Sequence, residues 1–188
     1  IWGIPFKIHP YWIVLLFLFS WSISDQVKLT ASDIYSVQES WLIGFFTSFF
    51  LLSSIVFHQI FHTYICLCEG VKIKNITFFF LGAILKIEKD CVTALGNIKI
   101  SLVRPTLCLI TSLCLLLISN NSNFKEAILI NVITRVGILN LFLGFFNLIP
   151  LGTLDGGNLF KSIIWYISGN KNKGRSLQNK LTFLVSII

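Results

Sequence analysis

Long apolar stretches that lack charged residues most strongly restrict what this chain can fold into. The longest, residues 40–68, runs for 29 residues without a single Asp, Glu, Lys or Arg. About 20 apolar residues cross the hydrocarbon core of a bilayer, and charges inside that core are costly. Such stretches are therefore predicted to be transmembrane helices. The predicted spans are residues 8–24, 40–68, 105–124 and 127–149, the last interrupted only by Arg135.

The composition excludes a soluble globular protein and a disordered one. The 188 residues are 55% hydrophobic and 12% charged, whereas an ordinary soluble domain is about 25% charged. We expect one membrane domain over residues 1–188, cropped at both ends because the chain has no Met and stops inside an apolar run. The predicted fold is an all-α polytopic bundle of about five or six transmembrane helices, with another span beginning at Leu181.

The distribution of basic residues orients these spans. The connections at residues 25–39 and 119–126 each contain one lysine, whereas residues 69–99 contain five. Another basic cluster follows the fourth span, between Lys161 and Lys180. Lys and Arg accumulate on the cytoplasmic side, so the N-terminus and both basic segments are expected in the cytoplasm. The net charge of +7 is spread between spans, which argues against nucleic-acid binding.

A small β-sheet is expected between the second and third spans. Residues 71–77 alternate apolar with polar side chains, which is the period of a half-exposed strand. Residues 78–88 continue as strand with a break at Gly82. Because charged residues bracket these segments closely, a sheet at the cytoplasmic membrane surface is favoured over another span.

The clearest candidate for chemistry is a histidine pair in the second span. His58 and His62 are four residues apart, so both imidazoles lie on one helix face and can bind one metal ion. Polar groups inside a span usually serve a function. Hydrogen bonds to neighbouring helices are the alternative role for these histidines.

A zinc site needs a third protein ligand, and Asp155 is the best candidate. It lies in the Gly-rich turn of residues 150–157, just after the fourth span. Non-helical backbone at membrane depth is tolerated where it lines a cavity within the protein. Alternatively, Asp155 caps a helix that starts near Asn158.

Several motifs make the chain similar to a known family. They are residues 3–12, the His58-x-x-x-His62 pair, Phe-Leu-Gly-Ala at 80–83, Asn-Leu-Ile-Pro at 147–150 and Leu-Asp-Gly-Gly at 154–157. In order and spacing these motifs resemble the site-2 proteases, which are intramembrane zinc metalloproteases, and the bacterial and cyanobacterial branch most of all. The last motif is the most specific.

The resemblance implies a role for each matching residue. His58, His62 and Asp155 would be the ligands of one Zn²⁺ ion per chain, and Asn147 would lie beside the scissile bond. The strand region would offer its edge to an unwound transmembrane protein or peptide substrate. The protein would be a multi-pass membrane protein of a bacterial inner or thylakoid membrane that cleaves transmembrane segments.

The sequence departs from the family at the position of the catalytic base. The residue after the first histidine is Glu in the family and Gln59 here, and a neutral amide cannot accept the proton of a zinc-bound water. Phe61 replaces a small Gly and is expected to crowd the site, and Thr153 replaces a Pro. Residues 101–105, Ser-Leu-Val-Arg-Pro, replace an Ala-Gly-Pro segment.

Two functions of different classes follow from these residues. The first is a zinc metalloendopeptidase of the site-2 type, catalytically impaired at Gln59. The second is a non-catalytic pseudoprotease that acts as a membrane binding or regulatory protein. A haem carrier is disfavoured, because His58 and His62 share a helix face and His9 would have to supply an axial ligand.

Overall fold

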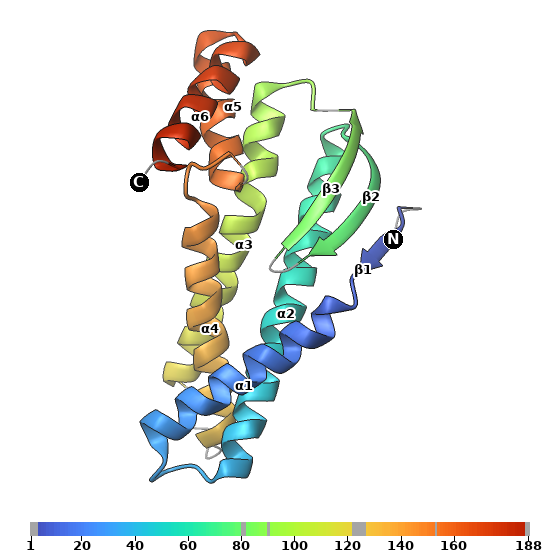
Figure 1. The fold of residues 1–188 in the computed structure, drawn as a ribbon. Helices are drawn as coiled ribbons and strands as arrows, with labels where there is room; N and C mark the ends of the chain where they lie inside the picture. Colours follow the sequence, from blue (N-terminus) through green and yellow to red (C-terminus); the bar gives the residue numbers. More distant parts are fainter. Residues whose placement is uncertain (1–3, 80–81, 90, 122–126, 153, 187–188) are drawn as a thin grey trace.

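The computed structural model describes residues 4–79, 82–89, 91–121, 127–152 and 154–186, which form six helices and a three-stranded sheet (Figure 1). Four helices of this described part are long and apolar enough to cross a membrane. They are α1 (Tyr11–Ala31), α2 (Val37–Cys68), α3 (Ala94–Asn121) and α4 (Ala127–Asn147). The prediction of a helical membrane bundle with a small sheet is confirmed.

The longest helix, α2, begins at a capping box. The Ser36 hydroxyl oxygen accepts a hydrogen bond from the backbone N–H of Glu39 at 3.3 Å, and the Glu39 carboxylate accepts one from the backbone N–H of Ser36 at 2.8 Å. These bonds satisfy amide groups that a helix start leaves unpaired. The helix continues for 32 residues, about 48 Å at 1.5 Å per residue, and its last turns lie beside the sheet (Figure 1).

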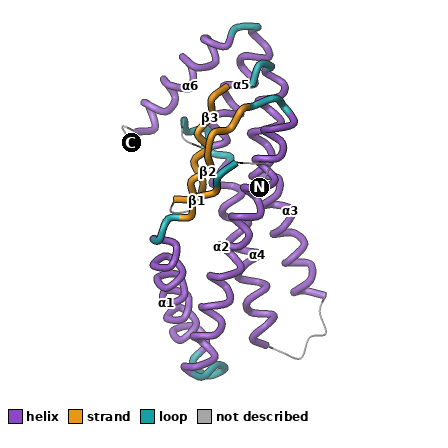
Figure 2. The backbone as a smooth tube through the Cα atoms, turned by 90° about the vertical axis from the view of Figure 1, so that its right-hand side faces the viewer, coloured by secondary structure: helices purple, strands orange, loops and turns teal. Residues whose placement is uncertain are grey.

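The sheet contains the two predicted strands and a third that the sequence pattern did not indicate. Its order is β1 (Phe6–Ile8), β2 (Lys72–Phe79) and β3 (Gly82–Lys89), with β1 parallel and β3 antiparallel to β2. Figure 2 shows the three strands, in orange, next to one another. Two residues of the motif at 80–83 lie outside the described residues. Since β2 is central, β3 is an edge strand.

The sheet is held on the bundle by its apolar face. Ile76 and Phe78 of β2 are completely buried and pack with Ile4, Trp12 and the α2 residue Val56. Burial of such side chains contributes about 1.5–3 kcal/mol each. The sheet therefore has one orientation on α2, and this orientation places β3 beside the candidate site.

After α4 the chain forms two shorter helices, and Leu181, where the sequence predicts the start of another span, falls within the second of them. The chain forms α5 (Asp155–Ser168) and then α6 (Lys171–Ser186), and neither is among the four candidate spans. Leu181 lies inside α6, whose first turns contain basic residues that a membrane core would exclude. Gly169, at φ 66°, ends α5 in the left-handed conformation that suits glycine.

Both basic segments lie at one end of the bundle. The sheet, α5 and α6 are at this end, and the connection from α1 to α2 is at the other (Figure 1). Helix α5 packs against α3 and α6. The arrangement agrees with the grouping that the lysine distribution predicts.

Candidate active site

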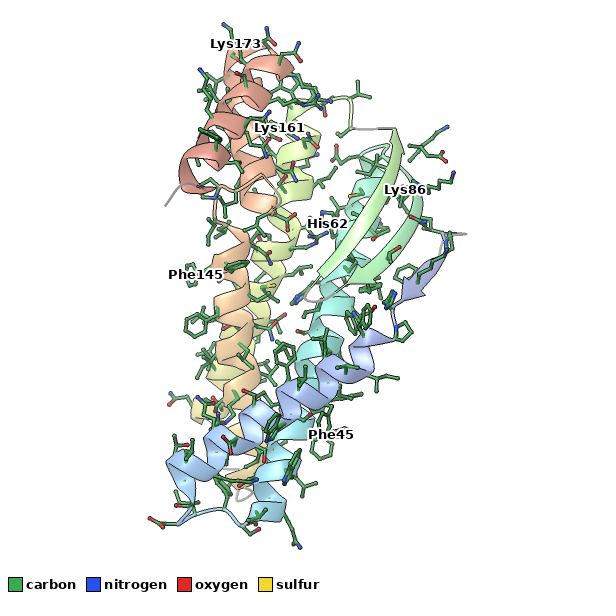
Figure 3. The ribbon with its side chains drawn as sticks, in the orientation of Figure 1. Phe45, His62, Lys86, Phe145, Lys161 and Lys173 are labelled. Atoms are coloured by element: carbon green, nitrogen blue, oxygen red, sulfur yellow. The ribbon has the colours of Figure 1, made fainter. Side chains whose placement is uncertain are left out.

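The two histidines of α2 lie on the buried face of the helix, as their spacing predicts. His58 is 2% exposed and His62 is 4% exposed. Figure 3 shows His62 on the side of α2 that faces α3. The pair therefore lies between helices and not on the lipid-facing surface.

His58 is engaged by two side chains of α3. Its Nδ1 atom lies 3.2 Å from the Cys108 sulfur, and its Nε2 atom lies 3.2 Å from the Thr111 hydroxyl oxygen. A neutral imidazole offers one donor and one acceptor, so these two contacts use both of its nitrogens. The Nδ1 atom of His62 lies 3.8 Å from the sulfur of Cys66, one turn further along α2.

Gln59, which the family resemblance predicts at the position of the catalytic base, is also buried. It is 2% exposed, and its Nε2 atom donates a hydrogen bond of 3.4 Å to the Thr63 hydroxyl oxygen. The same hydroxyl donates to the backbone carbonyl oxygen of Gln59 at 2.8 Å. The amide is therefore held within α2 and has no acid–base function at neutral pH.

Asp155 is the first residue of α5 and forms an ion pair with α3. Its carboxylate accepts hydrogen bonds from the Nη1 atom of Arg104, at 3.3 Å to Oδ2 and 3.5 Å to Oδ1. Burial raises the pKa of the Asp155 carboxyl group, and the Arg104 charge opposes this shift. The alternative of a helix cap is wrong, because α5 begins at Asp155 with Leu154 as its N-cap and without a side-chain capping bond.

Two glycines allow the start of α5 to approach the preceding turn. A Cβ atom on Gly156 would overlap the backbone carbonyl oxygen of Leu148, and one on Gly157 would overlap that of Leu151. Larger residues at either position would displace the turn and with it Asp155. This close approach is the structural reason for the two glycines of the Leu-Asp-Gly-Gly motif.

The predicted site residues line two separate cavities. His62 and Asp155 line a cavity of about 320 Å³, beside Leu85 and Ile87 of β3. His58, Gln59 and Asn147, the last residue of α4, line a second cavity of about 30 Å³. The smaller cavity can hold a water molecule and is too small for a peptide.

The donor atoms have the chemistry of a catalytic zinc site, but their arrangement does not fit a bound ion. Two imidazoles and a carboxylate are a common catalytic set. Here His58 is saturated by Cys108 and Thr111, and Asp155 is paired with Arg104. Within the described ranges, no group of three His, Cys, Asp or Glu side chains is close enough to hold a metal. The ligand assignment stays a prediction.

The residue that sequence reasoning missed is Arg104. The sequence marks its segment as a departure from the family but indicates no role for it. The available signal was the position of an arginine directly before Pro105, within a predominantly apolar helix, because such a charge requires a partner.

Phe61 does not crowd the site, contrary to expectation. Its side chain is 42% exposed and packs on Phe57, with ring centroids 4.9 Å apart. Residues 58 and 62 lie on the buried face, and position 61 lies on a different side of the helix. Thr153, the other expected disturbance, lies outside the described residues.

Comparison with known proteins gives the same family from sequence and structure. Residues 107–188 match the family model described as peptidase family M50. A putative zinc metalloprotease of Synechocystis sp., sll0528, is 34% identical over 175 residues, which cover 92% of this chain and 45% of that protein. The putative zinc metalloprotease Rip3 of Mycobacterium tuberculosis is 28% identical over 169 residues, 88% of this chain and 43% of that protein.

A solved structure has the same fold. The site-2 protease from Methanocaldococcus jannaschii superposes with a TM-score of 0.59 and 27% identity, covering 88% of this chain and 69% of that one. The chain spans less than half the length of the curated relatives it matches.

Proposed function

Since this chain is a member of the site-2 protease family, whose members are zinc metalloproteases, we propose that it is a membrane-embedded metalloendopeptidase domain with impaired peptide hydrolysis. The observation that carries the proposal is the buried amide of Gln59, bonded to Thr63 at the position of the base. General acid–base assistance contributes about 10²–10⁴-fold to such reactions. An amide supplies none of it.

His58, His62 and Asp155 are, in this proposal, the inherited metal ligands. Asn147 lies at the end of α4 and lines the smaller cavity together with Gln59. Its side-chain amide is suited to orienting a peptide carbonyl group near this cavity. Their roles are carried by family membership together with their position at the two cavities.

The segment that binds would be an extended stretch of a transmembrane protein or peptide. Edge strands offer unpaired backbone groups to a second chain. Strand β3 is such an edge, and its residues Leu85 and Ile87 line the larger cavity beside His62. A strand added to β3 would therefore run past the inherited ligands.

A photo-cross-linking side chain at Ile87 tests this docking mode. Ile87 is 44% exposed, and we expect it to cross-link to a co-reconstituted single-span peptide without cleavage of the peptide. The matched control is Lys74, an exposed residue of the central strand β2. Equal cross-linking from both positions would contradict docking at the β3 edge, and cleavage of the peptide would contradict impaired hydrolysis.

A non-catalytic membrane binding or regulatory protein is the second candidate function. The ion pair between Arg104 and Asp155 favours it, because this pair engages the carboxylate that a metal would need. Both functions predict client binding in the lipid bilayer. They differ in whether substitutions within the site can restore cleavage.

The proposed location is a bacterial inner or thylakoid membrane, with the N-terminus, the sheet, α5 and α6 in the cytoplasm. In a chain without its native cysteines, Ser176→Cys should be protected from an impermeant thiol reagent in intact cells and Ser32→Cys should react. Both positions are exposed and lie at opposite ends of the bundle. The reverse labelling pattern would invert the orientation.

A further inference from the structure

Arg104 lies between the two cavities that the predicted site residues line. Its side chain lines the larger cavity beside His62 and Asp155 and the smaller cavity beside His58 and Gln59. Among the described residues, it is the one side chain common to both cavities. A permanent positive charge therefore lies among the residues that we propose as inherited metal ligands.

The guanidinium group provides the charge compensation that a metal would otherwise provide. Arginine stays protonated in proteins, and its Nη1 atom lies 3.3 Å from the Asp155 carboxylate. Both groups are largely removed from solvent, with side-chain exposures of 22% and 8%. A divalent cation on the same carboxylate would meet a like charge in a site where water screens poorly.

The contacts of His58 independently argue against a bound metal ion. Both ring nitrogens of His58 already contact α3 side chains. Zinc binding would require that His58 release Cys108 or Thr111 and that Asp155 release Arg104. Both of these donor groups therefore have a protein partner to lose.

We propose that Arg104 is an internal cation that replaces the metal charge and keeps the His58, His62 and Asp155 set free of zinc. The inference rests on the proposed function, in which these residues are inherited ligands. It adds a second block to catalysis that is separate from Gln59. The ion pair also joins α3 to α5, so the bundle keeps its form without a metal.

Zinc content tests this directly. The purified full chain and its variants are incubated with zinc, passed through a desalting column and analysed by elemental mass spectrometry. We expect the native chain to retain little zinc, and Arg104→Gln to retain at least about tenfold more, the size of effect that groups bonded to metal ligands have on affinity. Adding Asp155→Ala to Arg104→Gln should remove the gain. Cobalt absorption bands provide a second readout of metal ligation.

Two control variants test whether it is the positive charge at position 104 that lowers zinc retention. Arg104→Lys keeps the charge and should retain as little zinc as the native chain. Lys99→Gln removes a positive charge from the same helix, at an exposed pair with Glu69, and should also change nothing. If Arg104→Gln does not fold, Arg104→Gly replaces it, since the family has a glycine in this segment.

Two results would overturn the inference. One is stoichiometric zinc in the native chain that falls on Asp155→Ala. The other is a folded Arg104→Gln or Arg104→Gly variant that retains no more zinc than the native chain. A native protein that binds zinc but does not cleave peptides would contradict only the proposed role of Arg104. A native protein that cleaves peptides would contradict the proposed function.

Discussion

Restoring the carboxylate by Gln59→Glu alone should leave cleavage of a membrane-embedded substrate near background, and adding Arg104→Gly should raise it by about 10²–10⁴-fold. Gln59 and Arg104 line the same small cavity, so an introduced carboxylate would pair with the guanidinium instead of accepting a proton. Removing Arg104 frees both the new base and Asp155. The measurement is release of product from a single-span peptide in liposomes, with and without a zinc chelator.

Phe61→Gly is the matched control for this experiment. It removes a large side chain from the same helical turn, but Phe61 is exposed and packs on Phe57. Combined with Gln59→Glu, it should add nothing. A gain from Phe61→Gly equal to that from Arg104→Gly would mean that crowding, and not charge, limits the site. Efficient, chelator-sensitive cleavage by the native chain would rule out impaired hydrolysis.

The second large effect is expected in stability. Asp155→Leu should lower the free energy of unfolding by about 3 kcal/mol, because loss of one partner leaves the Arg104 charge buried and unpaired. This lies at the lower end of the range for buried pairs, since Arg104 is 22% exposed. The double change Arg104→Met with Asp155→Leu should recover most of the loss. Unfolding in detergent micelles, followed by circular dichroism, measures all three.

The exposed pair of Lys99 and Glu69 is the control for this cycle. Its atoms are 2.8 Å apart, closer than those of Arg104 and Asp155, but the lysine side chain is 57% exposed. Lys99→Ala should therefore change stability by about 0–1 kcal/mol. If Arg104→Met gave no recovery in the Asp155→Leu background, Asp155 would be stabilised by something other than Arg104.

The spans, the two long strands and the histidine face were predictable because each depends on local pattern. Charge-free length marks a transmembrane helix wherever it occurs, and spacing of four residues places His58 and His62 on one face whatever surrounds them. The motifs also led to the correct family. Strand β1 was not predictable, because three residues have no measurable period and β1 exists only by pairing with β2.

Only the tertiary structure decided what the site residues contact. Arg104 and Asp155 are 51 residues apart, and the partners of His58 are on a different helix. The sequence by itself determined that His58 and His62 share one helix face and what chemistry the site residues carry. It did not determine their partners, because a charge or an imidazole in a helix bundle bonds with whatever group packing brings within reach. Here packing brought a guanidinium group to the carboxylate that we propose as an inherited metal ligand.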